Sequence, residues 1–225
     1  MIQTEHQRRA YLEALGIDVW APADQPVPEE ELIADGPDSA GMDWQALRTA
    51  VSDCTRCPLH ASRTQAVFGV GNENADWLII GEAPGAEEDR RGEPFVGRAG
   101  KLLDEMLRAA GQERGDVFIA NILKCRPPNN RDPEAAEAAA CRDYLKRQIE
   151  LIQPNIILAV GRIAAQQLLD TDTPVGRLRG QLHDFEGTPL VVTYHPAYLL
   201  RSPTQKRKSW QDLCLAMDVA AERAA

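Results

Sequence analysis

Residues 77–107 read WLIIGEAPGAEEDRRGEPFVGRAGKLLDEML, and this stretch decides the fold. The apolar run Trp77–Ile80 predicts a buried strand, and from residue 101 apolar side chains recur at helical spacing. The segment Gly81–Gly100 therefore leaves the carboxyl end of a strand, where open α/β sheets bind ligands. It carries a glutamate directly after the strand, an acidic triplet and a single phenylalanine. It is either one wall of a ligand site or a long polar surface loop.

The rest of the chain alternates strands with helices. Three further apolar runs predict strands at residues 117–122, 156–160 and 190–194. Helical periodicity is found at residues 99–110, 133–152, 162–170 and 204–223. Because the first three strands each precede a helical crossover, the sequence predicts an α/β fold with a parallel sheet and right-handed connections. A turn at Glu186-Gly187 indicates a local hairpin before the last strand.

Residues 1–42 differ in composition from the rest of the chain. Residues 6–20 form a short helical pattern, and residues 21–41 are rich in Pro, Asp, Glu and Gly, as in a disordered acidic linker. We expect residues 43–225 to form the folded domain. The hydrophobic peptide either packs on that domain or is a tethered docking peptide. Its sequence RRAYLEALGIDVW resembles the N-terminal peptide of the psi subunit of bacterial DNA polymerase III, which implies a replication or repair protein as partner.

The acidity of the chain belongs mostly to its N-terminal region. The formal net charge is -9, but residues 1–53 hold 11 acidic and 3 basic side chains, whereas residues 54–225 hold 23 and 22. A near-neutral body with basic residues at Arg201 and 206–208 does not exclude a DNA partner. There is neither an apolar run of membrane-spanning length nor a signal-peptide pattern. We therefore expect a cytoplasmic monomer without a membrane partner.

Five cysteines in a reducing compartment are more consistent with metal ligation than with disulfides. Four of them have the spacing C-x2-C, then 67 residues, then C-x15-C: Cys54, Cys57, Cys125 and Cys141. Four thiolates ligate either zinc or an iron–sulfur cluster, and the spacing alone does not choose between them. The remaining Cys214 is predicted to be a buried thiol of the last helix.

Polar side chains stand at the ends of three of the predicted strands. Glu82 follows the first strand, Asn121 ends the second, and His195 follows the last. Because parallel strands end at the same sheet edge, a carboxylate, a carboxamide and an imidazole should share one site. An amide offers a donor and an acceptor in one plane, which suits a nucleobase edge, and Phe95 supplies a stacking surface. Excision of a base requires such a set, because the nucleotide is flipped out of the helix and read in a pocket.

Three ordered segments resemble the signature motifs of the family 4 uracil-DNA glycosylases. They are GEAPGAEEDRRGEPFVGRAG from residue 81, NILKCRPPNNRDP from residue 121, and HPAYLLR from residue 195. The resemblance covers roughly residues 44–220. It implies a three-layer α/β/α sandwich with a central four-stranded parallel sheet. It also implies a 4Fe-4S cluster held by the four cysteines, with a structural role.

The resemblance further implies a role for each matching residue in the reaction. Glu82 matches the glutamate that helps to place the hydrolytic water, and His195 matches the imidazole that donates to uracil O2. Asn121 matches the amide that reads N3 and O4, and Phe95 matches the stacking aromatic. The expected reaction is hydrolysis of the N-glycosidic bond in uracil-containing DNA, single- or double-stranded, to leave an abasic site. No lysine is placed to form a Schiff base, so lyase activity is not expected.

Three other residues of the first motif have predicted roles in base binding. Ala83 and Gly85 belong to the turn whose backbone contacts the base. Ala83 stands where the family 1 enzymes have an aspartate, so catalysis should depend on leaving-group stabilisation and on water held by the glutamate. Glu88 matches a position that crowds the C5 face of the base and excludes thymine. The alternative is that Glu88 is a solvated acid in an acidic run.

The final motif and its flank are predicted to engage DNA. Leu199 and Leu200 are candidates to wedge into the base stack, and the alternative is that they are core residues of a short helix. A basic group is expected to contact phosphates: Arg201, Lys206, Arg207 and Lys208.

Three competing interpretations remain. A related group traps uracil-DNA covalently, but it carries an inserted basic loop with a reactive histidine, and residues 95–100 and 127–133 contain no histidine. Family 5 enzymes lack the carboxylate found here at Glu82. A non-catalytic iron–sulfur DNA-binding module would not need Glu82, Asn121 and His195 together.

Overall fold

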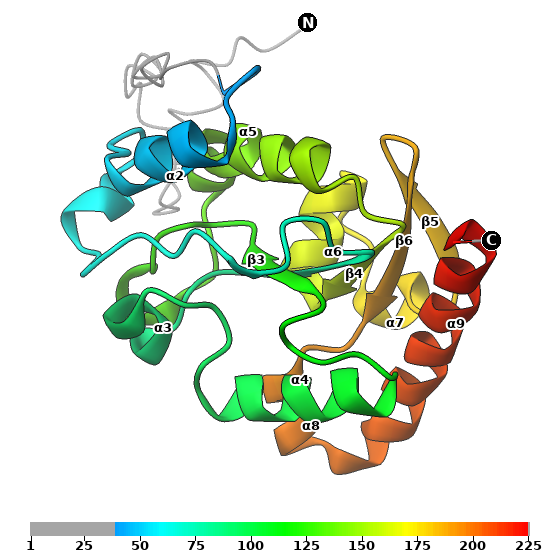
Figure 1. Cartoon of the computed structure of the whole chain (residues 1–225). Helices are drawn as coiled ribbons and strands as arrows, with labels where there is room; N and C mark the ends of the chain where they lie inside the picture. The colour runs from blue at the N-terminus through cyan, green and yellow to red at the C-terminus, as the bar shows by residue number, and fades with distance from the viewer. Residues whose placement is uncertain (1–38, 225) are drawn as a thin grey trace, which may run out of the picture. The chain divides into compact units, whose positions relative to one another are not determined.

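A mixed six-stranded sheet forms the centre of the part of the chain described by the computed structural model, residues 39–224 (Figure 1). In chain order its strands are β1 (Val70–Gly71), β2 (Trp77–Gly81), β3 (Phe118–Asn121), β4 (Ile156–Val160), β5 (Leu182–Phe185) and β6 (Thr188–Thr193). Their spatial order is β1-β3-β2-β4-β6-β5. The four inner strands are parallel, and an antiparallel strand closes each edge. The predicted central four-stranded parallel sheet is therefore confirmed.

Helices cover both faces of the sheet. The α-helices are α2 (Trp44–Ser52), α3 (Ala86–Arg91), α4 (Arg98–Ala109), α5 (Ala135–Ile152), α6 (Arg162–Leu169), α7 (Val175–Leu178), α8 (Pro196–Arg201) and α9 (Lys206–Ala224). Short 3-10 turns lie at Pro58–Ala61, Pro128–Asn130 and Pro203–Gln205. One apolar core joins the sheet to α2, α5 and α6, and a second joins the opposite face to α4 and α9. These are the three layers of an α/β/α sandwich (Figure 1).

Alternation along the inner strands creates the two cores. On β2, Leu78 and Ile80 contribute to the first core, whereas Trp77 and Ile79 contribute to the second. All five residues of β2 are buried, as expected for a parallel strand covered on both faces. The continuous apolar run seen in the sequence is the direct result of this double burial.

The strand order places a ligand site at β2. The chain goes from β2 outward to β3, and then crosses to β4 on the other side of β2. The carboxyl ends of β2 and β4 therefore flank the point at which the winding reverses, which is the usual ligand crevice of an open α/β sheet.

The predicted element boundaries hold within a few residues, and the predicted hairpin is confirmed. Strands β5 and β6 pair antiparallel, and Glu186 and Gly187 between them have positive φ of 48° and 88°. Such a pair of left-handed residues is typical of a tight hairpin turn. The segment expected as a loop after β2 differs, because it contains the short helix α3.

Residues 1–38, with the predicted helical peptide and most of the acidic linker, lie outside the described residues. Within residues 39–224, none of the helices combines the length and apolar character needed to span a membrane.

Candidate active site

A pocket of about 850 Å³ opens at the carboxyl ends of the parallel strands. It collects the predicted residues of all three sequence motifs: Glu82, Ala83, Gly85, Glu88, Phe95, Asn121, His195 and Arg201. Its other walls come from Ala99, Asn130, Gly161, Arg162, Pro174, Val175, Tyr194, Ala197 and Tyr198. Residues more than a hundred positions apart in the sequence thus line a single cavity.

The ends of β2 and β3 are bonded to each other beyond the last paired strand residues. Gly81 is in register with Asn121, the Ile122 N–H donates to the Gly81 carbonyl at 2.9 Å, and the Leu123 N–H donates to the Glu82 carbonyl at 3.0 Å. These bonds fix the backbone that carries Glu82 relative to the backbone that carries Asn121. The carboxylate and the carboxamide are therefore held by the sheet itself.

The buried amide of Asn121 has an unused acceptor. The residue is 2% exposed, and its Oδ1 atom has no hydrogen-bond partner among the described residues. A buried polar atom without a partner is unfavourable unless something else satisfies it. Because Asn121 lines the pocket, this acceptor is available to a hydrogen-bond donor that enters the pocket.

Phe95 lies close to the end of β2 because two glycines leave room for it. A β-carbon on Gly81 would lie 2.5 Å from Asn121 Oδ1 and 2.6 Å from Phe95 Cζ. A β-carbon on Gly100 would lie 1.7 Å from the Phe95 carbonyl oxygen. Phe95 itself has a positive φ of 53°, which is rare for an aromatic residue. Its ring stacks with that of His195 at 5.6 Å between centroids and an interplanar angle of 29°.

His195 is held in one tautomer. It precedes α8, and its Nδ1 atom accepts a hydrogen bond from the Ala197 N–H at 3.1 Å. The proton of the neutral ring is therefore on Nε2. Burial, with a further contribution from Arg201, lowers the pKa of His195 to about 4, against a small opposing effect of Glu88. At neutral pH the ring is an uncharged Nε2–H donor.

Glu82 is half-buried in the pocket, and its burial raises the pKa of the carboxyl group. Asp132 raises the pKa further, and Arg162 opposes this effect. The two opposing groups form an ion pair with each other, between Arg162 Nη2 and Asp132 Oδ2. A carboxylate with a raised pKa is a suitable general base or water-holding group.

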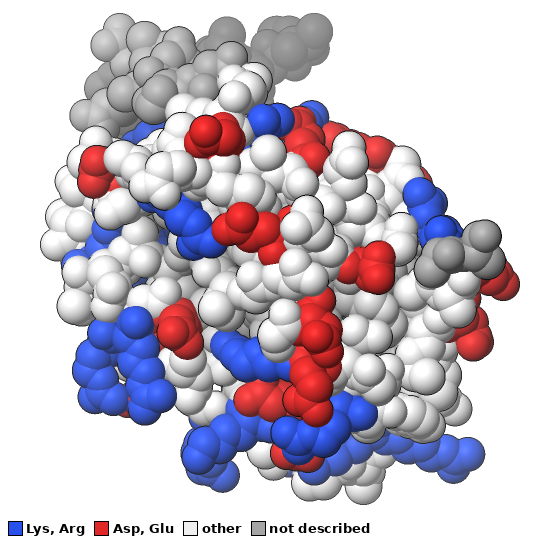
Figure 2. Space-filling model, viewed as in Figure 1, with Lys and Arg blue, Asp and Glu red and all other residues white. Residues whose placement is uncertain are grey.

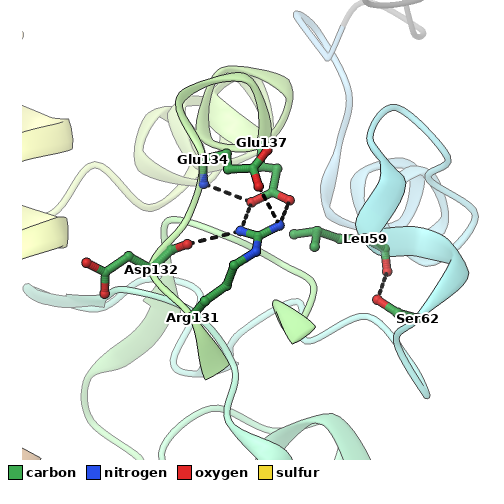
Figure 3. Close-up of polar contacts among 6 residues, drawn as sticks. All are labelled: Leu59, Ser62, Arg131, Asp132, Glu134 and Glu137. Carbon is green, nitrogen blue, oxygen red and sulfur yellow. Dashed lines mark hydrogen bonds and ion pairs between the residues drawn. The ribbon is translucent and has the colours of Figure 1, made fainter. Parts of the chain in front are cut away.

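The loop that supplies Asp132 is fastened to α5. Arg131 donates from both terminal nitrogens to the buried carboxylate of Glu137, at 2.8 and 2.6 Å, and Glu137 also accepts from the Glu134 N–H at 2.9 Å (Figure 3). The Asp132 carbonyl accepts from the same guanidinium at 3.0 Å, while its carboxylate points away from Arg131 (Figure 3). This arrangement leaves the Asp132 carboxylate free to pair with Arg162.

Glu88 lines the pocket and also braces its wall. Its Oε1 atom accepts hydrogen bonds from the Val96 N–H at 3.0 Å and from the Gly97 N–H at 3.1 Å. Gly97 is the residue before α4, so the Glu88 carboxylate satisfies N–H groups at the start of that helix. Glu88 is not a freely solvated acid. Its predicted effect on the C5 face of a base stays a prediction.

The four spaced cysteines also meet, on the first-core side of the sheet. One small cavity is lined by Cys54, Cys57, Cys125 and Cys141, together with Arg56, His60, Arg63, Lys124, Ala140 and Tyr144. Burial raises the pKa of the Cys57 and Cys125 thiols, and raises that of Cys141 to about 12. Among residues 39–224, no group of three or more His, Cys, Asp or Glu has the arrangement required to hold a metal ion.

Two arginines, Arg56 and Arg63, lie beside these thiols. The Nε and Nη1 atoms of Arg56 are buried and have no hydrogen-bond partner among residues 39–224. Arg63 Nη1 donates to Cys125 Sγ at 2.9 Å. Arg56 Nη2 pairs with Asp143 at 3.0 Å, and thiolates around a bound cluster would offer an acceptor to the two remaining buried donors.

Comparison with known proteins agrees with this geometry. Residues 68–215 match the model of the uracil DNA glycosylase superfamily. A type-4 uracil-DNA glycosylase of Archaeoglobus fulgidus is 48% identical over 169 residues, which are 72% of this chain and 84% of that protein. A type-4 uracil-DNA glycosylase of Thermotoga maritima is 49% identical over 68% of this chain and 80% of that protein. Another, of Pyrobaculum aerophilum, is 44% identical over 77% of this chain and 93% of that protein.

This chain belongs to the type-4 uracil-DNA glycosylase family.

On a member of this family, the surface around the pocket mouth is the surface expected to meet DNA. Arg201 lines the pocket, and Lys206, Arg207 and Lys208 are exposed at the start of α9. Figure 2 shows basic side chains, mixed with acidic ones, along the lower edge of the molecule, where Figure 1 places α4, α8 and the beginning of α9. The predicted phosphate-contacting residues are therefore placed on an accessible edge next to the pocket.

The structure corrects the prediction for one of the two leucines. Leu199 is 1% exposed, because it lies on the inward side of the short helix α8, so it is not available as a wedge. Leu200 is 38% exposed on the other side of the same helix. Cys214, predicted to be buried, is half-buried on α9.

Several residues at the pocket of this glycosylase-family chain were not predicted from the sequence. Arg162 follows Gly161 directly after β4, so the same argument from strand ends could have found it. Tyr194 and Tyr198 flank the histidine motif, and their rings lie 5.0 Å apart. Asn130 comes from the loop between two cysteines, and no local pattern indicated its position.

Proposed function

We propose that this chain excises uracil from DNA by hydrolysing the N-glycosidic bond, releasing uracil and leaving an abasic site. The observation that carries the proposal is the unpartnered, buried Oδ1 of Asn121 in the pocket. Uracil presents a single ring donor on its pairing edge, N3–H, flanked by carbonyl oxygens. The amide would accept from N3–H through Oδ1 and donate to O4 through Nδ2.

Stacking and hydrogen bonding together select the base. Phe95 would cover one face of uracil, since its ring lies against the end of β2 and beside His195. Cytosine presents an unprotonated N3 and an amino group to the same amide, so both contacts would be mismatched. Base flipping brings the nucleotide into such a pocket, and unstacking is the energetic cost that these contacts offset.

His195 would stabilise the leaving group. As the bond between C1′ and N1 breaks, the electron pair moves onto the base, and negative charge gathers on O2. The Nε2–H of a neutral imidazole, with Nδ1 already occupied by the Ala197 N–H, would donate to that oxygen. Because the pKa is about 4, the histidine need not change protonation for this role at neutral pH.

Glu82 would hold the water that attacks C1′ and would accept its proton as the new C–O bond forms. Ala83 offers no second carboxylate at this position. The reaction therefore depends on departure of the base, assisted by His195, more than on a strongly activated nucleophile.

The buried Lys124 does not line this pocket, and its Nζ donates to the Asn121 carbonyl and to Gln148. This placement gives no support to a Schiff base and hence to lyase activity.

We further propose that Cys54, Cys57, Cys125 and Cys141 hold a 4Fe-4S cluster. The unpartnered donors of Arg56 and the Arg63–Cys125 contact fit the negative charge of the thiolates. When bound, the cluster supplies a cross-link between the segment after α2, the end of β3 and α5. The loop that carries Asn130 and Asp132 lies between two of the cross-linked residues, Cys125 and Cys141.

For DNA engagement, we propose that Arg201, Lys206, Arg207 and Lys208 contact phosphates and that Leu200 enters the space that uracil leaves. A docked replication or repair protein at residues 6–20, the monomeric state and the cytoplasmic location stay predictions.

One assay tests the reaction class. Purified chain is incubated with oligonucleotides that contain a single uracil, in single-stranded and double-stranded form, and the products are separated before and after alkali. Strand breaks that appear only after alkali are the expected result. A protein–DNA complex that survives SDS would support covalent trapping instead, and binding without either product would support a non-catalytic module.

A further inference from the structure

Lys124 is a buried lysine that the proposed reaction does not use. Its side chain is 1% exposed. It follows Asn121 by three residues, at the point where β3 has ended and the chain turns toward Cys125. A buried ammonium is costly unless it is bonded, so its contacts indicate what the position is for.

Those contacts form a short buried network that ends at Asn121. Lys124 Nζ donates to the Asn121 carbonyl at 3.0 Å and to Gln148 Oε1 at 2.6 Å. Gln148, which is 0% exposed on α5, donates from Nε2 to the Phe68 carbonyl at 2.9 Å. The backbone of Asn121 is thus connected through two buried side chains to α5 and to the segment before β1.

This network acts on the backbone that carries the unpartnered amide. The N–H groups that follow Asn121 donate to the Gly81 and Glu82 carbonyls, so one side of this peptide run is held by β2. The Asn121 carbonyl is held from the other side by Lys124. With both sides fixed, the side chain of Asn121 leaves the backbone in one direction. A side chain that distinguishes bases by hydrogen bonds requires such placement, because a misplaced donor or acceptor loses most of its discrimination between bases.

We propose that Lys124 is a positioning residue for uracil recognition, which acts by holding the Asn121 carbonyl through the network it shares with Gln148. The inference rests on the proposed function of the pocket. Lys124 lines the cavity of the four cysteines and does not line the base pocket, so it has no direct contact with the substrate. The same side chain therefore connects the cysteine region with the residue that reads the base.

A double-mutant cycle tests this role. The variants are Lys124→Met, which keeps the length of the side chain and removes its donors, Asn121→Ala, and the two combined. Lys146→Met is the matched control, because that lysine is exposed on α5 and pairs with Glu186. For each protein, single-turnover excision, inhibition by free uracil, affinity for abasic-site DNA and visible absorbance of the cluster are measured.

Lys124→Met should slow excision about ten- to a hundredfold, because it leaves the buried Asn121 carbonyl without its donor. It should weaken inhibition by free uracil to a similar extent and leave affinity for abasic-site DNA unchanged. In the Asn121→Ala background it should add less than about twofold, since residues that act as a unit are not additive. A full additional loss in that background, or a parallel loss of abasic-site binding, would overturn the proposal.

Gln148→Met gives a second arm if Lys124→Met does not fold or loses its cluster. This variant keeps Lys124 and the four cysteines and removes the Gln148 Oε1 atom to which Lys124 Nζ donates. It should reproduce the same pattern with a smaller loss, about three- to tenfold. Unchanged uracil inhibition in Gln148→Met would contradict the proposal. If the native chain and Lys146→Met both bind uracil but excise none, the proposed reaction fails, while the effect of Lys124 on uracil affinity is still decided.

Discussion

At the scale of single residues, the pocket depends on close approach to the end of β2. Gly81 lies beside both Asn121 Oδ1 and the Phe95 ring, and no side chain fits there. The glycine is therefore required by the packing of its neighbours, since its own φ is not positive. Its neighbours are the two groups proposed to read and stack the base.

Gly81→Ala should displace one or both of these groups. We expect the free energy of unfolding to fall by about 1–3 kcal/mol, as for an overpacked core site, and excision to fall by at least about tenfold. Chemical denaturation and single-turnover excision measure the two effects. Gly115→Ala is the control, because a β-carbon there meets nothing within 4 Å, and it should change neither quantity. Normal activity of Gly81→Ala would mean that Phe95 and Asn121 are not placed as described.

The pH dependence of excision should report Glu82 and not His195. Burial and Asp132 raise the pKa of Glu82, so the carboxylate is lost by protonation as the pH falls through that raised value. His195, with a pKa of about 4, stays neutral until lower pH. The acid limb of the rate profile should therefore follow Glu82.

Asp132→Asn removes a negative charge that raises the pKa of Glu82. The acid limb of single-turnover excision should therefore move to lower pH in this variant. Asp218→Asn, an exposed change on α9, should leave the profile where it is. A shift of the acid limb to higher pH in Asp132→Asn would contradict the assigned electrostatics.

Sequence alone predicted Glu82, Asn121 and His195 because each stands at the end of a parallel strand, and the ends of parallel strands meet. It could not predict Asp132 or Lys124 as partners. Their positions depend on the path of a loop and on contacts between distant segments. For Leu199 and Leu200, neighbouring residues in a short helix face opposite ways, so the pair could not share one role.

At the scale of elements, the loop between Cys125 and α5 carries Asn130, which lines the pocket, and Asp132, which acts on Glu82. Asn129 and Asn130 both have positive φ, and the loop is fastened by the Arg131–Glu137 contact at the start of α5 (Figure 3). The hydrogen bonds from Arg131 are the largest cause of the lowered pKa of Glu137. This contribution to stability is present above the ordinary pKa of glutamate and is lost as the pH falls through the lowered value.

Glu137→Gln should lower the free energy of unfolding by about 1–3 kcal/mol at neutral pH. The difference from the native chain should shrink as the pH falls through the lowered pKa of Glu137. Denaturant titrations at several pH values measure both effects. Glu134→Gln, which changes a 66% exposed partner of the same arginine, should cost less than about 1 kcal/mol. Equal effects of the two substitutions would show that the buried contact does not fasten the loop.

Most elements could be predicted from periodicity, since the inner strands are continuous apolar runs and the long helices are amphipathic. The exceptions are short elements. Helix α3 has six residues, mostly charged, and lies in a segment that resembles a loop. Strand β1 has two residues and exists because it pairs with β3. Such elements are stabilised by their neighbours, and local sequence carries little sign of them.

At the scale of the whole molecule, acidic and basic residues are unevenly distributed along the chain. The acidic excess belongs to residues 1–53, whereas Arg201 lines the pocket and the basic residues 206–208 are exposed at the start of α9. Local electrostatics at the pocket can therefore favour DNA although the net charge is -9.

Replacing Lys206, Arg207 and Lys208 by Gln should weaken binding to duplex DNA. The slope of log affinity against log salt should fall by about 0.9 for each phosphate that the variant no longer neutralises. The measurement is a fluorescence anisotropy titration at several salt concentrations. Arg142→Gln with Lys146→Gln, on α5, is the control and should leave the slope unchanged. An unchanged slope in the triple variant would place the DNA elsewhere.

We propose that, in one pocket, Asn121 binds the pairing edge of uracil and His195 stabilises the departing base. Single-turnover excision from a uracil-containing oligonucleotide tests it most directly, when rates of the native chain, Asn121→Ala and His195→Ala are compared with their affinities for the same DNA. Loss of an oriented donor of this kind costs about 10²–10³ in rate, so we predict large losses in excision with little change in DNA affinity. Near-normal rates in both variants would contradict the claim.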